Sequence, residues 1–187
     1  EAVSWSEAIP CITDQKGYFV LNNDRVLQLE EGRLVMAVAL HRIPGGEWKN
    51  KGDLLCYYSD DDGMTWRSGS KVPDTTDIIT QEPGLTELEN GRLMMFIRSS
   101  GGFQQVSFSS DRGESWSHIE QSNIPSPLSP ATIERIPGTN DWILVWNNND
   151  GTKKEIEGKR TPYNLAISKD EGRSWEMIKV LEDNPEG

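Results

Sequence analysis

Glu82 and Arg98 are the residues of this sequence whose types and spacing best suit chemistry. Glu82 opens one segment of the chain, and Arg98 directly follows the apolar run Leu93–Ile97. The Asn90-Gly91 dipeptide between them predicts a tight hairpin turn, so the two charged residues are expected to lie together at the open end of the hairpin. Arginine is always charged and can donate two parallel N–H groups to one carboxylate. Residues of these types in this place are compatible with a site for a small anionic ligand.

The composition narrows the class of partner. The chain has 187 residues, 35% hydrophobic and 26% charged, and no apolar run long enough to cross a membrane. Its net charge of -11 argues against nucleic acid or anionic lipid as the main partner, whereas a local arginine cluster can still bind a small anion. No His/Cys/Asp cluster has ligand spacing, so neither a metal ion nor an organic cofactor is expected. Cys11 and Cys56 are expected to be free thiols in the core, with a disulfide as the alternative.

The elements that would position these residues come from a repeat. The pattern S-x-D-x-G-x-[ST]-W occurs in residues 59–66, 109–116 and 168–175. Its aspartate can accept hydrogen bonds from the backbone of its own turn, its glycine permits a positive φ, and its tryptophan is expected to pack between sheets. We interpret the pattern as a structural turn without a catalytic role. Its residues are Ser59, Asp61, Gly63 and Trp66, then Ser109, Asp111, Gly113 and Trp116, then Ser168, Asp170, Gly172 and Trp175.

The repeat predicts an all-β fold, a β-propeller with about three blades. Between the boxes, hairpin signals occur at Gly32 and Gly91, and no segment has a sustained helical period. Ser4-Trp5 resembles the end of a fourth copy with Ala2 at its glycine position, so we expect the chain to start within a repeat. The expected divisions are the end of a preceding blade over 1–12 and blades over 13–73, 74–125 and 126–187.

Polar residues at the ends of the inner strands are further candidates for ligand binding. Asn23, Asp24 and Arg25 occupy the place in the first repeat that Glu82 has in the second, and His41 ends the strand that follows. Gln104 is a candidate of the same kind in the second repeat. If Glu82 faces a central cavity, these side chains can face it too, although a structural role is the alternative for each. The candidates are Asn23, Asp24, Arg25, His41 and Gln104.

The three boxes resemble the Asp-box, or BNR, repeats of the sialidase (neuraminidase) superfamily, and the resemblance covers essentially the whole chain. It implies a six-bladed propeller whose central site uses three arginines to bind the substrate carboxylate. A glutamate there activates a nucleophilic tyrosine, and an aspartate serves as acid/base. Glu82 matches the glutamate, Arg98 matches one arginine, and Arg160 fits a second arginine one blade later. A neutral tyrosine avoids bringing a carboxylate toward an anionic sugar.

Other parts of that site have no match in this sequence. No segment resembles the Arg-Ile-Pro stretch of the first arginine, and we interpret residues 42–44 as a coincidence. The acid/base aspartate is expected before residue 1 and the nucleophilic tyrosine after Gly187, because Tyr163 is too close to Arg160. The segment alone is therefore expected to be inactive. A secreted or periplasmic protein would be typical of bacterial sialidases, although the first residues do not form a signal peptide.

The expected function is that of an exo-acting glycoside hydrolase that removes a terminal sialic acid or a related acidic sugar from a glycoconjugate. Two alternatives stay open: a carbohydrate-binding propeller without catalysis, and a hydrolase or lyase for another acidic sugar such as a uronic acid. A structural alternative is a homodimer, in which exposed sheet edges of two chains pair and complete the ring.

Overall fold

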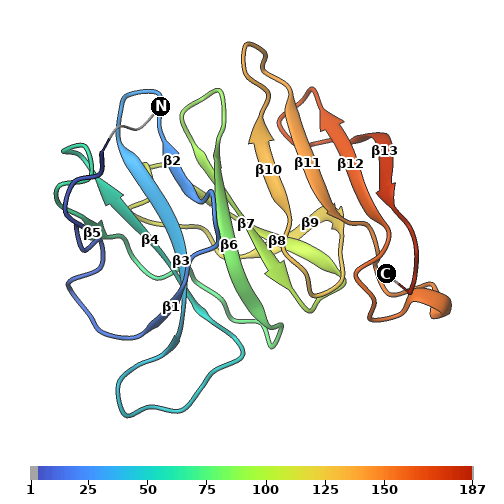
Figure 1. Cartoon of the computed structure of the whole chain (residues 1–187), viewed down its shortest axis with the longest axis horizontal. Helices are drawn as coiled ribbons and strands as arrows, with labels where there is room; N and C mark the ends of the chain where they lie inside the picture. The colour runs from blue at the N-terminus through green and yellow to red at the C-terminus, as the bar shows by residue number, and fades with distance from the viewer. Residues whose placement is uncertain (1–3, 187) are drawn as a thin grey trace.

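The computed structural model describes residues 4–186, which form three antiparallel sheets (Figure 1). The first sheet contains β1 (Tyr18–Val20), β2 (Val26–Gln28), β3 (Leu34–Arg42), β4 (Asp53–Ser59) and β5 (Arg67–Ser68). The second contains β6 (Thr80–Glu87), β7 (Leu93–Ser99), β8 (Phe103–Ser109) and β9 (Glu120–Pro125). The third contains β10 (Thr132–Arg135), β11 (Trp142–Asn147), β12 (Tyr163–Ser168) and β13 (Glu176–Glu182). The predicted all-β architecture is confirmed, with one 3-10 turn at Lys154–Ile156.

Each sheet is built from antiparallel neighbours, which are joined by tight turns in some places and by longer loops in others, as between β3 and β4 and between β11 and β12. The second and third sheets follow the orders β6-β7-β8-β9 and β10-β11-β12-β13, while in the first sheet both β1 and β2 pair with β3. Each sheet lies inside one of the ranges predicted for a blade, and residues 4–12 form no strand. The blade boundaries themselves stay predictions. Trp5 is 91% exposed, and Ala2 lies outside the described residues.

The Asp boxes close their turns with one repeated set of hydrogen bonds. In the first box the Ser59 hydroxyl donates to Asp61 Oδ1 at 2.8 Å and accepts from the Gly63 N–H at 2.9 Å. Asp61 also accepts from the Thr65 N–H at 2.8 Å and from the Thr65 hydroxyl at 2.6 Å. The other two boxes repeat these contacts. The carboxylate is therefore saturated by its own turn, which supports a structural role.

The backbone of the boxes is more constrained than the sequence pattern indicates. In each box the residue before the glycine also has a positive φ, which is 57° at Asp62, Arg112 and Glu171. Side chains other than glycine adopt this region at a cost, so the hydrogen bonds of the box must hold the turn.

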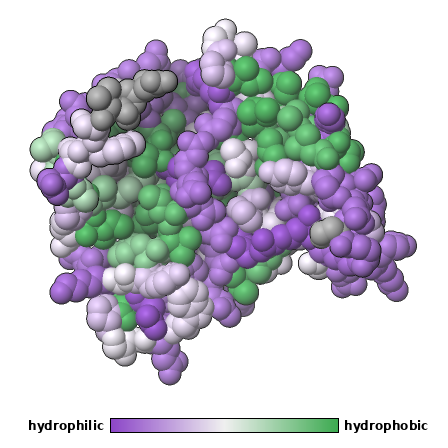
Figure 2. Space-filling model, in the orientation of Figure 1, coloured by the Kyte–Doolittle hydropathy of each residue, from purple (hydrophilic) through white to green (hydrophobic). Residues whose placement is uncertain are grey.

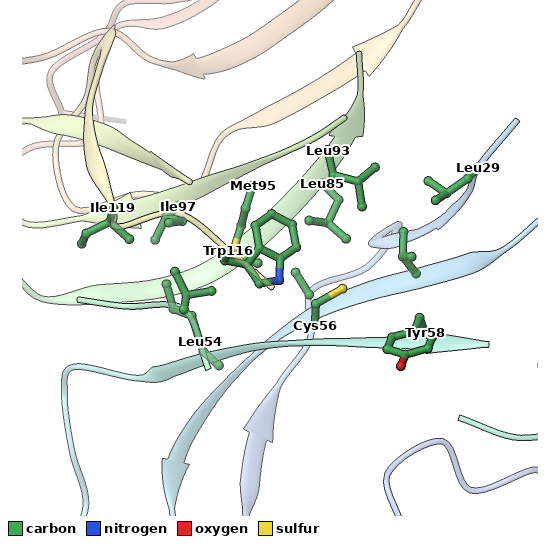
Figure 3. Packing of buried hydrophobic residues seen from close by; sticks show 14 residues of the cluster. Leu29, Leu54, Cys56, Tyr58, Leu85, Leu93, Met95, Ile97, Trp116 and Ile119 are labelled. Carbon is green, nitrogen blue, oxygen red and sulfur yellow. The ribbon is translucent and has the colours of Figure 1, made fainter. Parts of the chain in front are cut away.

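Two of the three box tryptophans pack between sheets. Trp116 lies between the first and second sheets with Leu54, Cys56 and Met95 (Figure 3). Gly113 of the same box packs so closely on this core that a Cβ there would lie 2.9 Å from Cys56 Sγ. Burial raises the pKa of the Cys56 thiol to about 12, and both Cys11 and Cys56 are free thiols.

The remaining boxes pack in two different ways. Trp175 packs against the core between the second and third sheets, where Asn123 Nδ2 donates to the Gly172 carbonyl at 3.1 Å. Trp66 packs on the other face of the first sheet, beside Tyr57 and Cys11. The predicted packing between sheets is thus seen for Trp116 and Trp175.

The two end sheets also carry apolar surface. Figure 2 shows one hydrophobic patch over the first sheet and another over the third, separated by a hydrophilic band. On β13, Met177, Ile178, Val180 and Leu181 are each more than one third exposed. These surfaces fit a sheet that packs against a further layer, and the homodimer that would supply one stays a prediction.

Candidate functional site

Strand register places Glu82 and Arg98 at one end of the strands of the second sheet and the Asp box at the other end. Gln81, next to Glu82, pairs with Arg98 at the end of β7, whereas Leu93 at the start of β7 pairs with Ser109 of the box. The candidate site and the structural turns therefore lie at opposite ends of the same strands.

A β-bulge at Glu82 sets the direction of its side chain. Gln81 pairs with Arg98 and Gly84 pairs with Phe96, so Glu82 and Pro83 together oppose the single residue Ile97. Glu82 has a φ of 43°, in the left-handed region that favours glycine. Bulges of this kind re-aim side chains, and strained residues persist only where their surroundings hold them.

The bulge brings Glu82 into an ion pair with Arg98. Arg98 Nη1 donates to Glu82 Oε1, and the Asn22 amide donates to Glu82 Oε2 at 3.3 Å. The two charged side chains are only 13% and 20% exposed, so their attraction is screened less than that of a surface pair. Arg98 Nε is buried and has no acceptor within residues 4–186, which leaves a donor for a ligand or a water molecule.

Arg25 of the first sheet contacts both other sheets near this pair. Its Nη2 donates to the Ala131 carbonyl at 2.7 Å, and its guanidinium lies 5.1 Å from the centre of the Phe96 ring. Burial lowers the pKa of Arg25, partly offset by Glu134, Asp24 and Glu82. Gly84 provides the space, since a Cβ there would lie 2.7 Å from Arg25 Nη1. Arg25 thus ties the first and third sheets together next to Glu82.

A hollow of about 510 Å³ adjoins these residues. Asn22, Asn23 and Arg25 line it from the first sheet, and Arg160 and Tyr163 line it from the third. Arg160 is exposed, and its Nη2 lies 3.4 Å from the Leu128 carbonyl. Asn22 lines the hollow and also donates to Glu82, whereas Glu82 and Arg98 themselves are not among the residues that line it. A joint role of Arg98, Glu82 and Arg160 therefore stays a prediction.

Two of the proposed ligand-binding residues lie elsewhere. His41 is 2% exposed, and its ring stacks on Trp48 with centroids 4.8 Å apart. Gln104 is fully buried, and its amide donates to Ser126 Oγ and to the Ser129 carbonyl, each at 2.8 Å. Neither side chain is among those that line the hollow. Their contacts are those of structural residues, and a role toward ligand stays a prediction for both.

Asp24 is exposed and has a φ of 59°. Its nearest acidic neighbour is Glu134 on β10, whose pKa is raised by burial and by the charge of Asp24. Sequence reasoning missed Glu134, although a charged residue within the short inner strand Thr132–Arg135 was a signal for it. It also missed Asn22, which is one position from Asn23, because the sequence did not show how many residues separate β1 from β2.

Two other findings concern residues 4–186 as a whole. No three His, Cys, Asp or Glu side chains of this part gather closely enough to hold a metal ion. Nor does any helix in it have the length and apolar character needed to span a membrane.

Comparison with known proteins places the sequence in a family. The model of the BNR repeat-like domain matches residues 1–187. The sialidase of Micromonospora viridifaciens is 28% identical over 160 residues, which cover 81% of this chain and 23% of that protein. The sialidase of Bacteroides fragilis is 26% identical over 183 residues, or 92% of this chain and 31% of the relative. The chain thus spans less than a third of these relatives.

Solved structures show the same fold. The Hadza microbial sialidase Hz136 superposes with a TM-score of 0.67 at 20% identity, covering 86% of this chain and 30% of that one. The Trypanosoma rangeli sialidase in complex with sialic acid gives 0.56 at 21% identity, covering 83% and 24%. The predicted sialidase-type propeller fold is confirmed, and the chain belongs to the BNR repeat-like domain family of the sialidase superfamily.

Proposed function

We propose that this chain forms part of the substrate site of an exo-acting glycoside hydrolase that removes a terminal sialic acid or a related acidic sugar. The observation that carries the proposal is the Glu82–Arg98 ion pair, which is held on a strained bulge and is linked through Asn22 to the hollow that Arg160 lines. A merely structural ion pair does not need a strained backbone or a buried donor without a partner. The sialidase relatives support the choice of substrate.

Arg98 and Arg160 bind the sugar carboxylate in this proposal. Guanidinium groups hold a carboxylate through charge-assisted hydrogen bonds, and the hollow between the first and third sheets offers space for one sugar ring. Arg25 stays in place as a support, because its Nη2 is already bound to the Ala131 carbonyl.

Glu82 acts on the nucleophile. Its carboxylate accepts from Arg98 and Asn22, so its position is set before substrate binds. From there it accepts the proton of a tyrosine hydroxyl as the phenolic oxygen bonds to the anomeric carbon, while the bond from that carbon to the leaving-group oxygen breaks and the acid/base aspartate protonates that oxygen. The tyrosine and the acid/base aspartate are expected outside this sequence, so the proposal assigns no residue of this chain to either role.

The test combines binding and turnover. Isothermal titration of the 187-residue chain with sialic acid should show binding that Arg98→Ala weakens strongly and that Arg160→Ala weakens less. The same chain should not hydrolyse a fluorogenic sialoside, and strong turnover would refute the expectation that its nucleophile lies elsewhere. Tighter binding of a uronic acid than of sialic acid would favour the alternative substrate class. A full-length parent that binds sialic acid but shows no turnover would favour a carbohydrate-binding propeller.

A further inference from the structure

Two large aromatic side chains outside the proposed site are fixed in place while facing solvent. Tyr18 on β1 and Trp48 in the loop after β3 are 50% and 49% exposed. Their rings pack edge to face, with centroids 5.1 Å apart and planes at 72°. Aromatic rings held this way lose little conformational entropy when a ligand packs on them, which is why they recur at binding sites.

The position of Trp48 depends on His41 and Asn50. The indole stacks on the buried His41 ring with planes 8° apart, and its Nε1 donates to Asn50 Oδ1 at 2.9 Å. His41 Nδ1 lies 2.7 Å from the Lys49 carbonyl, which can only accept, so Nδ1 carries a proton. The burial of His41 thus serves to hold the indole at the surface.

This loop is also attached to the strand that carries Glu82. The Gln81 amide donates to the Asn50 carbonyl at 2.7 Å, and the Gly52 N–H donates to the Thr80 carbonyl at 2.8 Å. In Figure 1 the loop between β3 and β4 extends from the same end of the sheets at which β6 begins. The aromatic pair therefore lies at the same end of the strands as Glu82.

A hollow of about 600 Å³ lies beside Tyr18. Lys16 and Arg42 line it together with Ile43, and neither basic side chain forms an ion pair with another residue of the described chain. In a chain with a net charge of -11, two unpaired cations beside an exposed aromatic ring form a local anion-binding surface.

We infer that Tyr18, Trp48, Lys16 and Arg42 form a second glycan subsite, which takes a sugar unit that carries an anionic group. The apolar face of the sugar ring packs on the aromatic pair, and its anionic group faces Lys16 and Arg42. The choice of a glycan rests on the proposed function, since the subsite lies at the same end of the strands as Glu82 and can contact a later unit of the same oligosaccharide.

The experiment uses α2,8-linked disialic acid, 3′-sialyllactose and free sialic acid as probes in isothermal titration against the whole chain. Disialic acid should bind at least about tenfold more tightly than the other two, because only it offers a second anionic sugar. Trp48→Ala and the pair Lys16→Ala/Arg42→Ala should remove that advantage and leave the affinity for free sialic acid unchanged. Trp5→Ala is the matched control, since Trp5 is exposed and outside the hollow.

The outcomes separate this inference from the proposed function. If Arg98→Ala strongly weakens binding of all three probes while Trp48→Ala changes none, the central site stands and the second subsite is refuted. If Trp48→Ala weakens disialic acid binding and Arg98→Ala affects no probe, the subsite stands and the proposed central site fails. Equal affinity for the three probes, or no binding of disialic acid, overturns the inference. Thermal melts of each variant show that a loss of binding is not a loss of fold.

Discussion

The two ends of the strands, one with the Asp boxes and one with the starts of the inner strands, differ in how closely their structure repeats from sheet to sheet. At one end of the strands the serine and aspartate of all three Asp boxes form the same hydrogen bonds, and the boxes share one backbone conformation. At the other end, the three inner strands begin in three different ways. The first is broken between β1 and β2, the second is bulged at Glu82, and the third pairs regularly from Thr132. The candidate chemistry lies where the repeat is broken.

The charged side chains are also satisfied differently at the two ends of the strands. Each box carboxylate receives its hydrogen bonds from neighbours within its own turn. At the other end of the strands, Arg98 keeps a buried Nε that has no partner among the described residues. The box end has one buried donor of this kind too, Trp175 Nε1, but it belongs to an indole and not to a charged group. Saturated groups stabilise a fold, whereas unsatisfied donors cost stability and become useful when a ligand pairs with them. The comparison predicts that substitutions at the two ends separate stability from binding.

The largest effect is expected from Arg98→Ala. It removes the guanidinium that contacts Glu82 and leaves that carboxylate 20% exposed without its cation, so affinity for sialic acid should fall by about a hundredfold. Titration calorimetry measures the loss. Arg173→Ala is the control, because Arg173 is exposed at the box end. Equal losses of affinity in the two variants would contradict the idea that binding is confined to the end of the strands that carries Glu82.

Asp111→Ala tests the other end of the strands. The substitution removes the acceptor of Ser109 and Ser115 in the box that packs between the first and second sheets, so the free energy of unfolding should fall by about 3 kcal/mol. Urea unfolding measures it. Asp170→Ala should cost less, since the tryptophan of its box, Trp175, is only partly buried, whereas Trp116 is 7% exposed. Protein that remains folded should bind sialic acid with unchanged affinity, and a marked loss would contradict the separation.

Gly84→Ala probes the support beneath Glu82. A Cβ at this position would lie 2.2 Å from the Phe96 ring and 2.7 Å from Arg25 Nη1, so both must shift, at a cost of about 2 kcal/mol. Affinity for sialic acid should fall as well, because Arg25 lies next to Glu82. Gly101→Ala is the control, since its Cβ would meet the flexible end of Ile78 at 3.1 Å. Thermal unfolding and titration compare the two variants.

The smallest effect is the dependence of stability on acid. Hydrogen bonds from Thr65 and Ser174 lower the pKa of Asp61 and Asp170, and those from Ser115 lower that of Asp111 despite its burial. A lowered pKa in the folded state adds stability above the unfolded pKa of about 3.9, and this stability is lost as the pH falls through the folded value. Urea midpoints should therefore decline below about pH 4. Asp111→Ala should flatten that decline, and an unchanged slope would mean that other carboxyl groups cause it.

Most of the architecture could be predicted because its signals are local. The turn before Arg92 and the box around Asp111 involve residues a few positions apart, and their spacing indicated the hairpins, the repeat and the neighbourhood of Glu82 and Arg98. The bulge at Glu82 and the environment of His41 could not be predicted in this way. The bulge depends on the register between β6 and β7, and the environment of His41 depends on how the loop with Trp48 packs.

The sequence by itself determined the kind of sheet, the turns that close each repeat and the family. These follow from residue types that interact with near neighbours along the chain. Only the tertiary structure decided which polar groups meet: Asn22 with Glu82, Arg25 with the Ala131 carbonyl, and Trp48 with His41 beside the start of β6. The reason is that contacts between different sheets carry no periodic signal in the sequence, because each is made once and depends on the packing of three sheets together.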